Sequence, residues 1–269
     1  MTRGGGDSRR ELASLGRASL TAPIITVLTD QEAHAAVAAE RLTSAIQRSC
    51  ALRGSAAVCL TGGRTIRDVY HQLADKQLGW RKQIAWARVH AFWSDERHVP
   101  SQHVDSNAGM AQCALLDHVP IPSEHIHPMR GDLPDAAVAA RRYERHLPAR
   151  FDVTLLGLGA DAHVASIFPG SRLLDGGRDV STLEGSRVQA VWAHHLNVWR
   201  ITLTPAEVLN AREILVLATG VEKATAVHAA LEAPFDVSRW PAQLLRAAGD
   251  RVEWILDAAA ARSLVLPSV

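Results

Sequence analysis

The 269-residue chain has few cysteines, little net charge and no long apolar run. Its three cysteines are an odd number without a CxxC pair, so the sequence suggests neither a disulfide framework nor a zinc knuckle. A formal net charge of +1 provides neither a basic field for nucleic acid nor a polybasic face for a membrane. No segment approaches the roughly 18 apolar residues of a membrane-spanning helix. These absences leave a small molecule as the expected partner and the cytoplasm as the expected location.

The start of the chain lacks the apolar core of a signal peptide. Residues 1–22 contain three consecutive glycines and several arginines, and we expect them to form a disordered tail. With 47% hydrophobic and 21% charged residues, the composition is that of an ordinary globular protein. We therefore expect residues 23–269 to form a single domain.

Short apolar or β-branched runs alternate with longer helical patterns after the tail. This order predicts an α/β fold with three αβα layers, in which helices cover both faces of a mainly parallel, Rossmann-like sheet. Strands are expected at 24–28, 56–60, 88–93, 152–156, 188–192, 199–203, 213–218 and 252–256. Helices are expected from 30 to about 52, after 65 through 73, through 110 to about 117, and at about 134–147, 221–231, 241–247 and 257–264.

Four polar or glycine-containing loops follow predicted strands directly, at 61–65, 94–97, 157–163 and 219–223. In open parallel sheets, ligands bind outside the carboxyl ends of the strands, where the loops converge. We therefore expect these four loops to share one binding site.

Residues 61–65 (TGGRT) join a predicted strand to a predicted helix. Gly62 and Gly63 let the backbone approach a ligand closely, and the helix N-terminus presents unpaired N–H groups. Thr61 adds a hydroxyl and Arg64 a forked donor, so the loop is suited to bind phosphate. The alternative is a tight turn that needs glycine only for its geometry, because the segment is neither a Walker loop nor a GxGxxG motif.

Two more cations stand near predicted strand ends. Lys223 follows the pair Thr219-Gly220 at the start of another predicted helix, and Arg200 opens the strand after Trp199. The repeated order of strand, glycine turn and helix start favours a second cation for the ligand. A solvated surface position is the alternative for Lys223.

Asp95, Glu96 and Arg97 come directly after a predicted apolar strand. Burying charged groups at such a place is costly unless the groups are paired or used, which favours a role in ligand binding. The alternative is a solvated loop with a local ion pair.

Asp161 and His163 lie two residues apart in the turn after the strand that ends at Leu156. A carboxylate can orient the imidazole, and an oriented imidazole can take a proton from water near neutral pH, as attack on an ester carbonyl requires. The alternative is a histidine that caps the next turn.

The thirteen histidines raise the question of a metal site, with the pairs His125/His127 and His194/His195 as candidates. No HExxH motif or Cys-His spacing supports one. We expect exposed or capping histidines there, and neither a metal nor an organic cofactor.

Six segments share a pattern with known proteins, in order and at similar separations. They are LTGGRT (60–65), FWSDERHVP (92–100), DSNAGMAQ (105–112), FDVTLLGLGADAHVASIFPGS (151–171), RITLT (200–204) and LATGVEKATAV (217–227). Together they resemble the 6-phosphogluconolactonase branch of the glucosamine/galactosamine-6-phosphate isomerase superfamily. The resemblance covers nearly all of the chain after the tail.

This resemblance implies hydrolysis of 6-phospho-D-glucono-1,5-lactone to 6-phosphogluconate in the oxidative pentose phosphate pathway, without metal or cofactor. His163 would be the general base, Asp161 would orient it, and Arg97 would stabilise the oxyanion or fix the sugar. The residues that would bind the phosphate or the rest of the substrate are Thr61, Gly62, Gly63, Arg64, Asp95, Arg200 and Lys223.

The deaminase branch of the same superfamily differs at two places. Deaminases continue the histidine turn with a Phe-Asn-Glu-Pro-like stretch, whose glutamate assists ring opening, whereas residues 164–170 here read VASIFPG. They also tend to carry tyrosine where this chain has Arg97. Both differences favour the lactonase over an amino-sugar-phosphate deaminase.

Ala162 departs from the lactonase pattern, which usually has glycine before the histidine. If the backbone there has a positive φ, alanine strains the turn by roughly 1 kcal/mol or displaces His163. A non-catalytic sugar-phosphate-binding protein is therefore the alternative to an enzyme. We expect a monomer or a weak homodimer.

Overall fold

The computed structural model describes residues 21–174, 185–194 and 196–265. Residues 1–20 of the expected disordered tail lie outside this part of the chain, and so do residues 266–269 of the expected domain.

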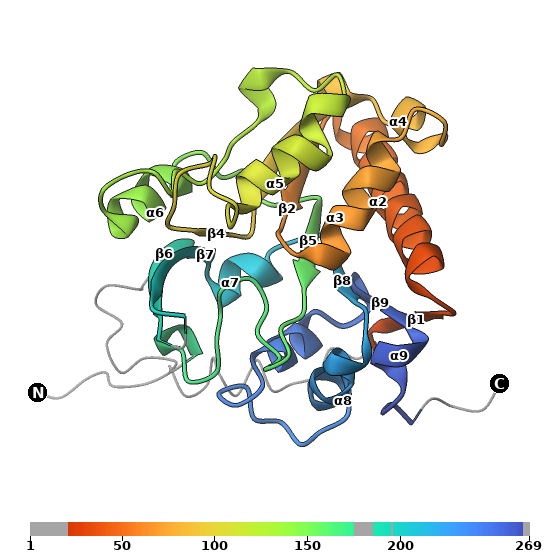
Figure 1. Cartoon of the computed structure of the whole chain (residues 1–269), viewed down its shortest axis with the longest axis vertical. Coiled ribbons are helices and arrows are strands. Elements are labelled where there is room, and N and C mark those ends of the chain that lie inside the picture. The colour runs from red at the N-terminus through yellow and green to blue at the C-terminus, as the bar shows by residue number, and fades with distance from the viewer. Residues whose placement is uncertain (1–20, 175–184, 195, 266–269) are drawn as a thin grey trace, which may run out of the picture.

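A six-stranded parallel sheet forms the centre of the fold, with strand order β1-β9-β8-β5-β2-β3. Its strands are β1 Ile24–Leu28, β2 Ala56–Leu60, β3 Val89–Trp93, β5 Val153–Gly157, β8 Glu213–Ala218 and β9 Val252–Asp257. The interior strands are nearly continuous apolar runs because helices cover both faces of the sheet. Helices α2 and α3 lie on one side, and α7 and α8 lie on the other (Figure 1). The predicted three-layer α/β fold is confirmed.

A second, three-stranded antiparallel sheet has the order β4-β7-β6. Its strands are β4 Asp95–Arg97, β6 Val188–Ala193 and β7 Val198–Leu203. The expectation of a loop at 94–97 is therefore wrong for Asp95–Arg97. Three charged residues show no alternation of apolar and polar side chains, so this strand depends on the edge that β7 offers to it.

The α-helices begin and end close to the predicted positions. They are α2 Gln31–Arg53, α3 Arg64–Ala74, α4 Trp80–Gln83, α5 Asn107–Ala114, α6 Ala136–Glu144, α7 Pro205–Leu209, α8 Ala224–Leu231 and α9 Ala258–Ala261. Asp30 caps α2, because its carboxylate accepts the Ala33 N–H at 2.9 Å. The short helices α4 and α7 were not expected.

Short 3-10 helices account for most remaining differences. They are η1 Trp86–Arg88, η2 Leu116–His118, η3 Ser123–His125, η4 Arg172–Leu174, η6 Val221–Lys223 and η7 Pro241–Arg251. The expected α-helix at 241–247 is thus a 3-10 helix, interrupted at Gly249, which has a φ of 57°. The helix expected from 221 starts with a 3-10 turn before α8.

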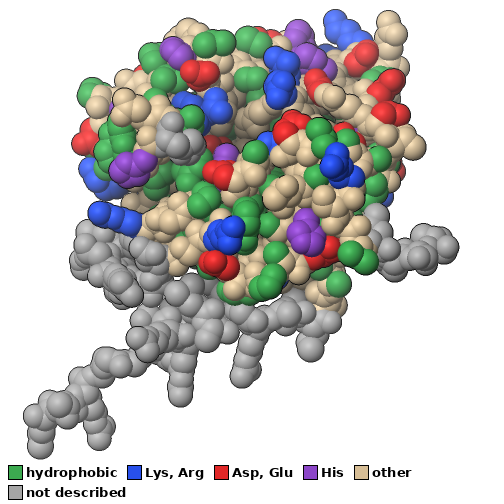
Figure 2. Space-filling model, turned by 60° about the horizontal axis from the view of Figure 1, so that its bottom comes forward, with side chains coloured by type: hydrophobic (Ala, Val, Ile, Leu, Met, Phe, Trp, Pro, Cys, Tyr) green, Lys and Arg blue, Asp and Glu red, His purple; other side chains and the backbone are tan. Residues whose placement is uncertain are grey.

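The hydrophobic core extends across both sheets. Buried side chains of the second sheet, such as Ile201 and Leu203, belong to the same cluster as Leu155 and Val216 of the central strands. Within the described ranges, no helix is long and apolar enough to cross a membrane. On the face shown in Figure 2, acidic and basic side chains are interspersed, as the small net charge leads one to expect.

Candidate active site

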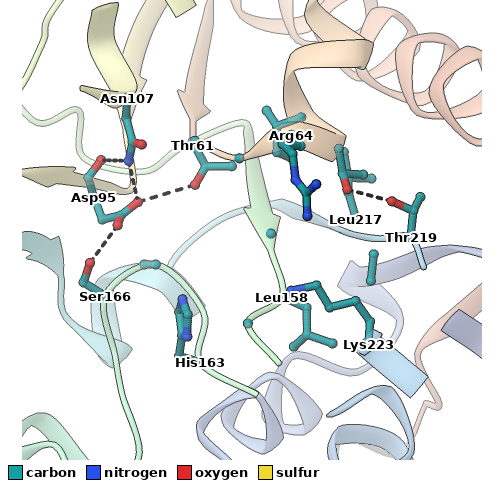
Figure 3. A pocket seen from close by; sticks show the side chains of 18 of the residues that line it. Thr61, Arg64, Asp95, Asn107, Leu158, His163, Ser166, Leu217, Thr219 and Lys223 are labelled. Atoms are coloured by element: carbon teal, nitrogen blue, oxygen red, sulfur yellow. Dashed lines mark hydrogen bonds between the residues drawn. The ribbon is translucent and has the colours of Figure 1, made fainter. Parts of the chain in front are cut away.

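A cavity of about 530 Å³ opens at the carboxyl ends of β2, β5 and β8 (Figure 3). This volume is typical of small-molecule sites, which span roughly 300–1,000 Å³. Of the ten site residues predicted from the sequence, nine line it: Thr61, Gly62, Gly63, Arg64, Asp95, Arg97, His163, Arg200 and Lys223. The tenth, Asp161, lies beside His163. The structure therefore brings the predicted residues together.

The Gly-Gly loop connects β2 to the N-terminus of α3. Gly63 has a φ of 116°, a conformation that residues with a side chain rarely adopt, and α3 begins at the next residue. The Tyr70 hydroxyl fixes the loop from within α3, since it accepts the Thr61 N–H at 3.1 Å and donates to the Thr61 carbonyl at 2.9 Å. The free N–H groups of α3 are thus held at the cavity.

Arg64 and Lys223 approach the cavity from different elements and point toward the same space (Figure 3). Burial lowers the pKa of Lys223, and the Arg64 charge lowers it further, whereas Glu222 and Asp161 act in the opposite direction. A hydrogen bond of 2.7 Å between the Thr65 and Thr219 hydroxyls joins the two loops. Two cations beside a helix N-terminus form a favourable place for an anion.

Arg97 and Arg200 form a second pair of cations in the same cavity. They are direct partners across β4 and β7. In each guanidinium, the Nε is buried and has no hydrogen-bond partner among the described residues. Burial and the neighbouring Arg97 charge lower the pKa of Arg200, whereas Asp95 raises it. Both arginines line the cavity and bring positive charge to it.

His163 forms the predicted pair with Asp161. Its Nδ1 lies 2.5 Å from Asp161 Oδ1, and its backbone N–H donates to the same oxygen at 3.2 Å. Burial alone raises the pKa of Asp161, but its interactions with His163 outweigh this effect and lower the pKa to about 2. Gly159 packs against the pair so closely that an added Cβ would overlap both side chains. An ionised carboxylate thus holds the imidazole at the cavity.

The φ of Ala162 is 62°, so the positive φ considered from the sequence is present. His163 is not displaced, because its hydrogen bond to Asp161 is formed. Two backbone hydrogen bonds stabilise the turn: the Ala162 N–H donates to Gly159 at 3.0 Å, and its carbonyl accepts the Ala242 N–H at 2.9 Å. Of the two consequences expected from the sequence, the strain is the one that applies.

Glu96 has a structural role, whereas the sequence suggested a role in ligand binding for Asp95, Glu96 and Arg97 together. Its buried carboxylate accepts the N–H groups of Asn107 and Ala108, each at 2.7 Å, and the Ser106 hydroxyl at 3.0 Å. Burial raises its pKa, and the hydrogen bonds from the backbone oppose this shift. Glu96 therefore anchors the N-terminus of α5 to β4.

Two more polar residues line the cavity and were not singled out from the sequence. Asn107 donates to the carbonyl and the carboxylate of Asp95, at 2.9 and 3.2 Å. Ser166 donates to the other carboxylate oxygen of Asp95 at 2.7 Å. Both stand in segments that carry the family resemblance, but their partners are distant along the chain, so the sequence gives no sign of these contacts.

Of the candidate metal ligands, His125, His127 and His194 are not among the residues that line this cavity. His125 and His127 pack around His90, with ring centroids 3.9 and 5.7 Å from its own. His195 lies outside the described residues. In the ranges that the structure covers, no group of three or more histidine, cysteine or acidic side chains is arranged to hold a metal ion.

Comparison with known proteins identifies the family. The family described as glucosamine-6-phosphate isomerases/6-phosphogluconolactonase matches residues 29–254. The chain belongs to this family. Among relatives in it, the 6-phosphogluconolactonase of Streptomyces coelicolor is 37% identical over 260 residues, covering 90% of this chain and 95% of that protein. The one from Synechocystis sp. is 33% identical over 254 residues, covering 90% and 99%.

Solved structures of the family share the fold. The 6-phosphogluconolactonase of Trypanosoma brucei has a TM-score of 0.76 and 29% identity, covering 91% of this chain and 100% of that one. A monomeric glucosamine-6-phosphate deaminase has a TM-score of 0.77, with coverage of 90% and 100%, but its 21% identity shows only a common fold. The sequence-based family assignment is confirmed.

Proposed function

We propose that this protein hydrolyses 6-phospho-D-glucono-1,5-lactone to 6-phosphogluconate, a reaction of the oxidative pentose phosphate pathway. The observation that carries the proposal is the presence of a carboxylate-bound histidine and a phosphate-type loop in one cavity. The similarity to relatives named 6-phosphogluconolactonase supports this substrate.

The substrate phosphate binds at the Gly-Gly loop. The N–H groups at the start of α3 donate to its oxygens, Thr61 lines the same loop, and Arg64 and Lys223 neutralise the phosphate charge. Arg200 also lines the cavity and adds a further positive charge there. Asp95 contributes by holding Thr61 and the neighbouring loops in place.

His163 acts as the general base. Because the ionised Asp161 accepts a hydrogen bond from Nδ1, the proton of the neutral ring stays on that nitrogen and Nε2 is left as the acceptor. Nε2 takes a proton from water while the water oxygen forms a bond to C1 of the lactone. The imidazolium then returns the proton to the ring oxygen as the C1–O bond breaks, so that a free carboxylic acid and hydroxyl result.

Negative charge develops on the carbonyl oxygen of C1 during this attack. Arg97 lines the cavity with a cationic side chain, which one hydrogen bond from Nη1 to the Asp105 carbonyl holds in place. We assign it to the oxyanion or to the sugar hydroxyls. A donor fixed before the reaction stabilises the charge without reorganisation of solvent.

The direct test follows the decay of freshly generated lactone with and without purified protein, since the lactone also hydrolyses spontaneously. A lactonase accelerates the decay above the background. Stabilisation by 6-phosphogluconate without turnover would instead identify a non-catalytic binding protein. Ammonia release from glucosamine 6-phosphate would identify a deaminase.

We also propose a cytoplasmic enzyme that is a monomer or a weak homodimer. Its three cysteines form no disulfide, as is usual in a reducing compartment. Light scattering coupled to gel filtration measures the mass, and a stable higher oligomer would contradict this proposal.

A further inference from the structure

The turn that carries His163 contains two strained residues. Ala162 and Ala165 have φ values of 62° and 50°, on either side of the histidine. Residues with a Cβ rarely adopt this left-handed conformation, because it is sterically unfavourable. Such residues persist where surrounding structure fixes them. The position of the imidazole therefore depends on contacts that reach out of the turn.

Ser166 provides two of these contacts and is fully buried. Its hydroxyl donates to Asp95 Oδ2 at 2.7 Å, and its backbone N–H donates to the Thr202 hydroxyl at 3.1 Å. Asp95 and Thr202 are direct partners across β4 and β7, so both contacts reach the same position of the second sheet. Thr202 donates onward to the Leu203 carbonyl at 3.1 Å, which leaves its lone pairs for Ser166.

Asp95 connects Ser166 to the Gly-Gly loop, the expected phosphate loop. Its Oδ1 lies 3.2 Å from Asn107 Nδ2 and 3.5 Å from the Thr61 hydroxyl, whereas its Oδ2 accepts the hydrogen bond from Ser166 (Figure 3). The carboxylate is almost completely buried. One side chain thus joins the loop after β2, the start of α5 and the histidine turn.

We propose that Ser166 is a positioning residue, which acts through Asp95 and Thr202 to fix the imidazole of His163 relative to the phosphate loop. This inference rests on the proposed function. The sugar ring limits how far C1 can lie from the 6-phosphate. The distance between the phosphate-binding loop and the imidazole therefore decides whether His163 can reach the water that attacks C1. Small errors in such geometry cost large factors in rate. The phosphate contacts come from other loops, so loss of the Ser166 hydroxyl lowers kcat rather than raising KM.

The experiment compares Ser166→Ala with Ser171→Ala. Ser171 lies in the same segment, and its hydroxyl accepts the Leu173 N–H at 3.3 Å, away from Asp95. We expect Ser166→Ala to lower kcat by roughly 10- to 100-fold, the scale that misplaced reacting groups produce, with KM changed by less than about threefold. Ser171→Ala should keep both values. An unchanged kcat in Ser166→Ala, or a raised KM alone, overturns the proposal.

A second variant covers the case in which Ser166→Ala does not fold, as judged by circular dichroism. Thr202→Val removes the other contact of Ser166 and leaves Asp95 in place. It should give the same selective loss of kcat, and full activity in this variant would overturn the proposal.

Nuclear magnetic resonance of the His163 ring separates this inference from the proposed function. Long-range ¹H–¹⁵N spectra report the tautomer whether or not turnover occurs. We expect one tautomer, protonated at Nδ1, in the wild type and exchange between forms in the variant. Identical ring spectra overturn the positioning role, whereas a wild type without lactonase activity overturns the proposed function alone.

Discussion

At residue 162, a buried alanine is held in the left-handed region by its surroundings. This conformation costs a residue with a Cβ roughly 1–2 kcal/mol. The Ala162 methyl is fully buried, and both backbone polar groups are paired, with Gly159 and Ala242. Packing and hydrogen bonds therefore offset the strain, and the imidazole next to it keeps its place on Asp161.

We accordingly expect Ala162→Gly to change kcat by less than about threefold, which corresponds to less than 1 kcal/mol in the barrier. The catalytic pair is already formed in the wild type, so relief of the strain brings little. Steady-state kinetics, with Ala160→Gly as a control for added flexibility in the same turn, checks this. A gain of about tenfold or more, seen only in Ala162→Gly, would mean that alanine does misplace the histidine.

Contacts between residues that are close in the sequence were easier to predict than contacts between residues that are far apart in it. Asp161 and His163 are two positions apart, so their pairing can be read from a local pattern. Ser166 and Asp95 are 71 positions apart, and only the path of the chain through both sheets brings them together. Tyr70 was likewise expected as part of a helix, but its hydrogen bonds to Thr61 depend on how that helix packs.

At the scale of elements, the site is formed where strands end. Strands β2, β5 and β8 are buried apolar runs, and these were predicted because parallel strands covered on both faces have this pattern. Strand β4 was missed because its composition does not indicate a strand. It is a strand because it pairs with β7. Glycine and charge in the loops predicted where the next helices start, which explains why the Gly-Gly loop was expected at the site.

The role of the Gly-Gly loop and of η6 in binding phosphate can be tested through Arg64 and Lys223. We expect Arg64→Ala and Lys223→Ala each to raise KM for the phosphorylated lactone by roughly tenfold or more, because hydrogen bonds to charged groups contribute about 1.5–3 kcal/mol. Arg67→Ala is the matched control, since Arg67 lies on α3 outside the cavity. Steady-state kinetics measures the effect.

The same two variants should leave the hydrolysis of the lactone without phosphate unchanged. If both substrates lost affinity equally, the two cations would contact the sugar or shape the cavity. The assignment of Arg64 and Lys223 to phosphate would then be wrong.

For the whole molecule, one core extends across both sheets, and we propose that the described residues from 23 onward unfold as one unit. Among the described residues, three buried or half-buried imidazoles outside the active site have a lowered pKa: His34, His90 and His127. Burial lowers the pKa of His34, and burial together with neighbouring histidines lowers the pKa of His90 and His127. Their neutral forms are therefore the ones compatible with the folded state.

This arrangement predicts a loss of stability in mild acid. In the unfolded chain these histidines titrate near pH 6.5, whereas in the folded chain they hold protons less readily. The free energy of unfolding should therefore be highest above about pH 6.5 and decrease as the pH falls below this value. Thermal unfolding between about pH 5 and about pH 8 measures the trend.

His90→Gln and His127→Gln isolate the contribution of the histidine group from that of the carboxylates. Each variant should show a smaller decrease in Tm below about pH 6.5 than the wild type. The exposed His71, replaced by glutamine, serves as the control and should keep the wild-type slope. Equal slopes in all four proteins would exclude His90 and His127 as the cause.

The central claim is that His163 activates water for attack on a bound sugar-phosphate lactone. His163→Ala tests it most directly, beside His228→Ala, which removes an exposed imidazole whose Nδ1 lies 3.0 Å from Glu232. We expect His163→Ala to lower kcat by about 10²–10⁴-fold, the usual contribution of a general base, while calorimetry still detects binding of 6-phosphogluconate. His228→Ala should retain activity. A His163→Ala protein that hydrolyses the lactone at the wild-type rate would contradict the account.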